Sequence, residues 1–211
     1  MDLPCEAAAA QQFLRAINRH SARLERMVKD LLDLARLESP AKQFAPETLN
    51  PRRIADDLHH RFAETIAAKG VLWEAHITPP DAASVRLSPQ LLALVLDNLV
   101  DNAIKFTPAH RHVRFHIDRP PDAVVFTVSD EGCGIPPEDQ QRVFERFYQV
   151  ERARSGSERG TGLRLPIVRH AVGALRGTVQ LTSTLDHGTR ISVHIPQPPP
   201  APPRHPALTP Q

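Results

Sequence analysis

The sequence has few cysteines, almost no net charge and no long apolar run. Its 211 residues hold two cysteines, one near the N-terminus and one inside a glycine motif, which excludes a disulfide scaffold. Lysine and arginine number 26 against 24 acidic residues, so the net charge of +2 gives no reason to expect nucleic-acid binding. No apolar run approaches the roughly 20 residues of a membrane-spanning helix, and the N-terminus lacks a secretory signal. We therefore expect a cytoplasmic chain with no membrane segment and no nucleic-acid partner.

What the sequence does contain is apolar material and unevenly placed proline. Hydrophobic residues make up 41% of the chain, which is enough for a packed core. Eight of the 21 prolines fall in the last 16 residues, and residues 197–211 are predicted to form a disordered tail. A proline-rich recognition peptide for a partner is the alternative for this tail.

The N-terminal region is typical of one long amphipathic helix. Residues 11–38 contain neither glycine nor proline, and apolar residues recur at steps of three, four and seven. The stripe consists of Phe13, Ile17, Leu24, Val28, Leu31 and Ala35. A lone helix cannot bury such a stripe, so we expect it to pack on a partner helix from this chain or from another.

The rest of the chain mixes helices and strands without strict alternation. Helices are predicted at 51–69, 89–106 and about 162–174, with strands at 71–77, 113–117, 124–128, 178–183 and 190–195. Residues 41–50 are predicted to be a loop. This order predicts an α+β two-layer sandwich, in which helices cover one face of a mixed sheet and the long N-terminal helix comes first.

Four polar residues of the helix at 89–106 are spaced by three and four positions: Asn98, Asp101, Asn102 and Lys105. Side chains at this spacing share one helical face. Amide oxygens and an ammonium group could hold a hydrated divalent cation and a phosphate, because hard cations prefer oxygen ligands. The alternative is an ordinary solvated face of an amphipathic helix.

Three further motifs follow. Asp130 and the glycines Gly132 and Gly134 come after a strand, where a carboxylate can accept a hydrogen bond from an exocyclic amine beside a flat ring. The run Gly160-Thr-Gly-Leu163 opens a helix, whose free N–H groups suit a polyphosphate. An aromatic segment, 144–148, precedes a basic stretch typical of a hinged lid over an anion. Each motif alone is equally compatible with a plain turn or surface loop.

The order and spacing of the four motifs resemble the GHKL nucleotide-binding fold, and specifically the catalytic domain of sensor histidine kinases. The resemblance runs from about residue 49 to 196, and the N-terminal helix is similar to the second helix of the family's dimerisation and phosphotransfer hairpin. It implies a partial dimerisation and histidine-phosphotransfer helix at 1–40 and an ATP-binding catalytic domain at 41–196. It also implies transfer of the γ-phosphoryl group of Mg-ATP to a histidine, for relay to the receiver domain of a response regulator.

The resemblance also implies residue roles. Catalytic roles fall to Asn98, Asn102, Lys105 and Arg146, and the two asparagines would hold Mg²⁺. ATP would be bound by Asn98, Asn102, Lys105, Phe106, Asp130, Gly132, Gly134, Ile135, Phe147, Gly160, Thr161, Gly162, Leu163 and Thr189. Weaker candidates for neutralising charge are Arg152, Arg154 and Arg159.

Asn98 favours phosphoryl transfer over hydrolysis. Relatives that hydrolyse ATP carry a glutamate there to activate water, and an amide cannot accept that proton. A GHKL ATPase or a serine-directed kinase is therefore the less favoured alternative.

The chain also departs from the family pattern. It lacks the family's histidine–acid…proline acceptor motif, and His20 without its flanking acid and proline is expected to be a solvated helix residue. Arg164 stands where the pattern has glycine, and it could crowd the phosphates or add a cation to them. A truncated, non-catalytic module that binds ATP or a partner is thus an open alternative. With half of its hairpin missing, the homodimer through the N-terminal helix should be weak, and a full-length form could be anchored in the inner membrane.

Overall fold

The protein is described here by a computed structural model that covers residues 3–38, 44–80, 84–150 and 160–197. In chain order its elements are α1 (Leu3–Glu38), β1 (Glu47–Leu49), α2 (Pro51–Lys69), β2 (Leu72–Thr78), β3 (Val85–Leu87), α3 (Pro89–Phe106), β4 (His112–Asp118), β5 (Ala123–Asp130), the 3-10 turns η1 (Pro137–Asp139) and η2 (Arg142–Phe144), α5 (Arg164–Ala174), β6 (Thr178–Thr184) and β7 (Gly188–Pro196).

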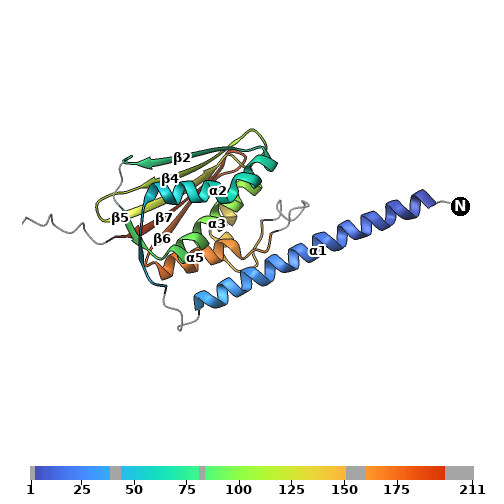
Figure 1. Ribbon diagram of the computed structural model, residues 1–211, viewed down its shortest axis with the longest axis horizontal. Helices are drawn as coiled ribbons and strands as arrows, with labels where there is room; N and C mark the ends of the chain where they lie inside the picture. Colours follow the sequence, from blue (N-terminus) through green and yellow to red (C-terminus); the bar gives the residue numbers. More distant parts are fainter. Residues whose placement is uncertain (1–2, 39–43, 81–83, 151–159, 198–211) are drawn as a thin grey trace, which may run out of the picture.

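These elements form two layers, with α1 extending away from them (Figure 1). The strand order of the main sheet is β2-β4-β5-β7-β6, and α2, α3 and α5 lie together on one of its faces. Strands β2 and β4 pair in parallel while the other neighbours are antiparallel, so the sheet is mixed. The predicted α+β two-layer sandwich is confirmed.

The boundaries of α2 follow from local chemistry, as predicted. The side chain of Asn50 accepts hydrogen bonds from two backbone N–H groups of the first turn. Pro51 has no backbone N–H, and at the first helical position this costs no hydrogen bond within the helix. Gly70 ends the helix in the left-handed conformation, with φ of 69°, and its N–H reaches the Ile66 carbonyl oxygen. In α3, Ser88 accepts a hydrogen bond from the backbone of the first turn in the same way.

The core lies between the sheet and its helices because strand side chains alternate between the two faces. Val113, Phe115 and Ile117 of β4 are fully buried against the helices. The intervening side chains of β4 point to the open face of the sheet. The apolar face of α3 packs in the centre of this core, and the polar residues of α3 lie outside it.

Helix α1 begins at Leu3, earlier than the predicted residue 11, and ends at Glu38, before the predicted Ser-Pro stop. Most of its apolar stripe is uncovered, including Phe13, Ile17, Leu24, Val28 and Leu31. Near its C-terminal end the helix does meet the sandwich, where Leu34 is 3% exposed and packs with Leu163 and Ile167. His20 is exposed, in agreement with a solvated residue. Among the helices that the structure describes, none is both long and apolar enough to cross a membrane.

Two predicted boundaries need correction. The segment predicted to be a loop, 41–50, contains β1, which pairs antiparallel with β3. Strands of three residues are too short to show a period of two, so local periodicity could not predict this pair. The packed region also reaches Gln197, which is buried and accepts a hydrogen bond from the Arg86 N–H. The remainder of the predicted tail, 198–211, lies outside the described residues.

Candidate functional site

A cavity of about 460 Å³ lies between α3, the end of β5 and the segment that leads into α5. Ten of the residues predicted from the sequence line it: Asn102, Lys105, Phe106, Asp130, Gly134, Ile135, Gly160, Thr161, Gly162 and Thr189. Five predicted residues are described but are not part of this lining: Asn98, Gly132, Arg146, Phe147 and Leu163. Apolar side chains complete the walls, so the cavity is an apolar slot with polar groups at selected points.

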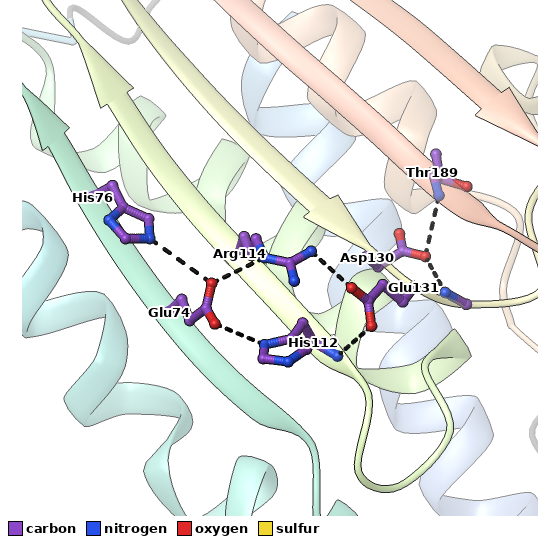
Figure 2. Close-up of polar contacts among 8 residues, drawn as sticks. Glu74, His76, His112, Arg114, Asp130, Glu131 and Thr189 are labelled. Carbon is purple, nitrogen blue, oxygen red and sulfur yellow. Dashed lines mark hydrogen bonds and ion pairs between the residues drawn. The ribbon is translucent and has the colours of Figure 1, made fainter.

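The carboxylate of Asp130 lies at the end of β5. Its Oδ1 accepts hydrogen bonds from the backbone N–H groups of Gly132, at 2.9 Å, and Thr189, at 3.3 Å (Figure 2). Burial raises the pKa of Asp130 from 3.8 to about 6, and the two N–H donors oppose this rise. Neither donor uses Oδ2, so the carboxylate keeps an oxygen with which to accept a hydrogen bond from a ligand.

The loop after β5 is fastened to the β6–β7 hairpin. Gly134 has a φ of 66°, and a Cβ there would overlap the Thr184 carbonyl group. The next residue, Ile135, donates its N–H to the Ser183 hydroxyl at 2.8 Å. Gln140 donates to the carbonyl oxygens of both Ile135 and Ser183. This wall of the cavity is therefore held by hydrogen bonds before any ligand binds.

Helix α3 supplies the polar edge of the cavity. Asn102, Lys105 and Phe106 all line it, and the Lys105 ammonium lies 4.7 Å from the centre of the Phe106 ring. A Cβ built on Gly160 would lie 3.4 Å from the Lys105 nitrogen, which shows how closely α3 approaches the glycine segment before α5. An ammonium and exposed backbone N–H groups thus face the same space.

Asn98 lies one turn earlier on α3. Its side-chain nitrogen donates to the Leu94 carbonyl oxygen at 2.8 Å, which leaves its amide oxygen outside that hydrogen bond. Asn102 lines the cavity, and the side-chain amides of both residues contain the neutral oxygen ligands that Mg²⁺ accepts. The donor set therefore fits a magnesium ion at the rim of the cavity, with Asn102 on the cavity side.

The glycine segment before α5 connects the cavity to α1. Gly162 has a φ of 72°, and a Cβ there would lie 2.7 Å from the Phe147 carbonyl carbon. The Thr161 hydroxyl donates to the Asp30 carboxylate of α1 at 2.6 Å. Leu163 points away from the cavity into the small cluster with Leu34. No local pattern in the sequence could predict the contact between Thr161 and Asp30, because 131 positions separate them.

The aromatic segment contributes less directly than predicted. Phe147 is 60% exposed, and its N–H donates to the Gly162 carbonyl oxygen at 2.9 Å. The Arg146 guanidinium lies 3.4 Å from a ring nitrogen of His170, on the outside of α5. Tyr148, the last residue of the predicted aromatic segment, and Gln149, which was not predicted, line the cavity. The predicted lid arginines, Arg152, Arg154 and Arg159, lie outside the described residues.

Arg164 replaces the glycine of the family pattern and is the first residue of α5. Its guanidinium forms an ion pair with the Asp101 carboxylate and lies 3.4 Å from the Asn102 amide oxygen. Asp101 and Asn102 were predicted to share a face of α3, but the sequence could not show that this face meets the start of α5.

Charged residues also gather on the open face of the sheet, beside the end of β5 (Figure 2). Arg114 lies between Glu74 and Glu131, at 2.9 Å and 2.8 Å, and His112 contacts Glu74 at 2.8 Å. The hydrogen bond from Arg114 lowers the pKa of Glu74, and the His112 N–H lowers the pKa of Glu131 with further help from Arg114. Within the described residues, no group of three His, Cys, Asp or Glu side chains could hold a metal ion.

Comparison with known proteins shows the family to which this chain is similar. A family model described as histidine kinase-, DNA gyrase B-, and HSP90-like ATPase matches residues 88–199, which include α3, Asp130 and the glycine segment before α5. The chain is 34% identical over 194 residues to the sensor histidine kinase WalK of Bacillus subtilis, a match that covers 89% of this chain and 31% of that protein. The chain therefore spans about a third of the length of this relative.

Two solved structures have a similar fold. Full-length ShkA in complex with AMPPNP matches with a TM-score of 0.76 and 25% identity, over 92% of this chain and 40% of ShkA. The histidine kinase ThkA in complex with the response regulator protein TrrA matches with a TM-score of 0.69 and 21% identity, over 90% of this chain and 52% of ThkA. The second match shows a shared fold.

Proposed function

The chain belongs to the histidine kinase-, DNA gyrase B- and HSP90-like ATPase family, as a sensor histidine kinase catalytic domain, and from this premise we propose a specific activity. It binds Mg-ATP and transfers the γ-phosphoryl group to a histidine, for relay to the receiver domain of a response regulator. The observation that carries this proposal is the half-buried Asp130 carboxylate, held by two backbone N–H groups at the end of an apolar slot.

The slot and Asp130 suit the adenine base. A flat ring fits between apolar walls, and its exocyclic amine donates to the oxygen of Asp130 that the protein leaves available. The carboxylate must be ionised for the strongest hydrogen bond of this kind. The glycine loop beside it also lines the slot and is fixed by the hydrogen bond from the Ile135 N–H to the Ser183 hydroxyl.

The phosphates would lie between α3 and the glycine segment. Lys105 offers an ammonium, and Gly160 and Gly162 offer backbone N–H groups at the start of α5. Asn98 and Asn102 would hold Mg²⁺, which supplies positive charge that neutralises the phosphate oxygens as the bond to the γ-phosphorus changes. Asn98 itself accepts no proton from water, so this chain favours transfer to a docked imidazole over hydrolysis.

The acceptor and the partners come from outside the described domain. The sequence contains no histidine–acid…proline motif, so the acceptor histidine would be supplied by another segment. The uncovered apolar stripe of α1 supports docking of a partner helix, and hence a homodimer. The relative ThkA was solved with a response regulator, which supports the same class of partner here.

A second candidate function is a non-catalytic module that binds ATP or a partner. The ion pair between Arg164 and Asp101 favours it, because it brings a side chain to the polar edge of the cavity where the family pattern has glycine. The two candidates differ in phosphoryl transfer and share nucleotide binding.

Two measurements separate these possibilities. Calorimetry of the 211-residue chain with AMPPNP and magnesium should give binding that the variant Asp130→Asn weakens strongly. Radiolabelled ATP should then label a separately supplied fragment that holds a histidine–acid…proline helix. Binding without labelling would select the non-catalytic module, and the absence of binding would reject both.

A further inference from the structure

The guanidinium of Arg164 occupies the polar edge of the cavity. It lines the cavity, forms an ion pair with Asp101 and lies 3.4 Å from the amide oxygen of Asn102. Its side chain is 22% exposed, so it is held in place rather than extended into solvent. A cation of the protein therefore sits beside the oxygen that is proposed to bind Mg²⁺.

This placement changes the charge available to a polyphosphate. Among the described residues that line the cavity, Lys105 and Arg164 carry positive charge and Asp130 carries a carboxylate. A divalent ion at Asn102 and the guanidinium would repel each other at this distance. Guanidinium groups bind phosphate oxygens through two parallel hydrogen bonds, which makes arginine a natural partner for the anion itself.

We propose that Arg164 binds the phosphates of the nucleotide directly and takes over part of the charge that Mg²⁺ supplies, so that this chain binds nucleotide with little dependence on magnesium. The inference rests on the proposed ATP-binding function. Asp101 acts as a positioning residue, because its carboxylate holds the guanidinium over the edge of the cavity before the nucleotide arrives. When phosphate binds, the guanidinium exchanges the carboxylate for phosphate oxygens within the same part of the site.

The test is the affinity for ADP, measured by calorimetry in millimolar magnesium and in EDTA, for the whole chain and for its variants. The ratio of the two dissociation constants measures the dependence on magnesium. In the unaltered chain the ratio should be below about tenfold, and in Arg164→Gln it should rise by about tenfold, which is the size of one lost charge-assisted hydrogen bond. Arg164→Lys should give an intermediate ratio.

Controls make the outcome specific. Arg169→Gln removes a cation from the exposed side of the same helix and should leave the ratio unchanged. Asp101→Asn frees the guanidinium, and it should weaken binding in EDTA by less than Arg164→Gln does. Circular dichroism confirms that each variant is folded, and Arg164→Lys provides a conservative replacement if Arg164→Gln is not.

Each result has a defined meaning. An equal ratio in Arg164→Gln and the unaltered chain overturns the inference, and so does tighter binding of nucleotide by Arg164→Gln in EDTA, because the arginine would then obstruct the phosphates. Both results leave nucleotide binding intact and so retain the proposed function. If the unaltered chain binds no nucleotide with or without magnesium, the proposed function fails and the inference fails with it.

Discussion

Asp130 is the last residue of β5 and Glu131 follows it directly, yet the two carboxylates lie on opposite faces of the sheet (Figure 2). Asp130 lies in the cavity, where burial raises its pKa to about 6. Glu131 lies on the open face, where the N–H of His112 and the guanidinium of Arg114 lower its pKa. The alternation of side chains along a strand is sufficient to separate the two environments.

The comparison shows that the site carries a cost in stability which the open face does not. A raised folded-state pKa means that Asp130 favours folding while it is protonated: this contribution is fully present below the ordinary pKa of 3.8 and is lost as the pH rises through about 6 and the carboxyl group ionises. A lowered pKa has the opposite sign, so Glu131 stabilises the fold above its ordinary value of 4.5 and loses that contribution in acid. Four variants test this contrast.

The largest contrast should appear in nucleotide affinity. Asp130→Asn replaces the acceptor of the adenine amine with a neutral amide, and it should weaken AMPPNP binding by about 10- to 100-fold, as expected for a lost charged hydrogen bond. Glu131→Gln removes the neighbouring charge from the other face and should change the affinity by less than about threefold. Calorimetry measures both, and equal losses in the two variants would show that overall charge, and not the position of Asp130, determines binding.

The second contrast is in stability, where Asp130→Asn should bring a gain although it weakens nucleotide binding. At about pH 8, Asp130→Asn should raise the free energy of unfolding by about 1–2 kcal/mol, because it removes a charge whose burial is unfavourable. The increase should shrink as the pH falls through about 6 and disappear near pH 3, below the ordinary value of 3.8, where Asp130 is mostly protonated in both the folded and unfolded states. Urea unfolding at the two pH values measures it, with Glu131→Gln as the matched control. A variant that is less stable than the parent at pH 8 would contradict the unfavourable burial.

The third contrast is in the pH dependence of binding. Only ionised Asp130 offers its full strength as an acceptor, so the affinity of the unaltered chain should fall by about tenfold for each pH unit below about 6. The nucleotide phosphates titrate in the same range, and Asp130→Asn retains that ligand effect while it removes the effect of the carboxylate. Subtracting the two profiles isolates Asp130, and parallel profiles would exclude it as the titrating group.

Much of this comparison could be predicted from the sequence, because it depends on local periodicity. The strand predicted at 113–117 lies within β4, and the motif after the next strand identified Asp130. The helix predicted at 51–69 has the bounds of α2. These signals need only short stretches of chain.

The unpredicted features depend on contacts between distant segments. Arg164 with Asp101, Thr161 with Asp30, and β1 with β3 each join residues that no local pattern relates. The apolar stripe of α1 was expected to pack on a partner helix from this chain or from another, and its C-terminal end packs on α5 inside the same chain. Such contacts follow from how the layers stack, and a single sequence contains no measure of that stacking.

The smallest contrast concerns Arg114, which bridges the two carboxylates of the open face. Its side chain is 39% exposed, so water screens both ion pairs and Arg114→Ala should lower the free energy of unfolding by at most about 1 kcal/mol. High salt should remove most of that difference, because mobile ions screen exposed charges. Nucleotide affinity should stay within about twofold of the parent, since the network lies across the sheet from the cavity. Arg114→Lys keeps the positive charge but cannot bridge Glu74 and Glu131 as the guanidinium does, so its stability should lie between that of the parent and that of Arg114→Ala. A loss of affinity in Arg114→Ala that high salt does not reverse would mean that the open face helps to position Asp130 through Glu131, and that the two faces are mechanically coupled.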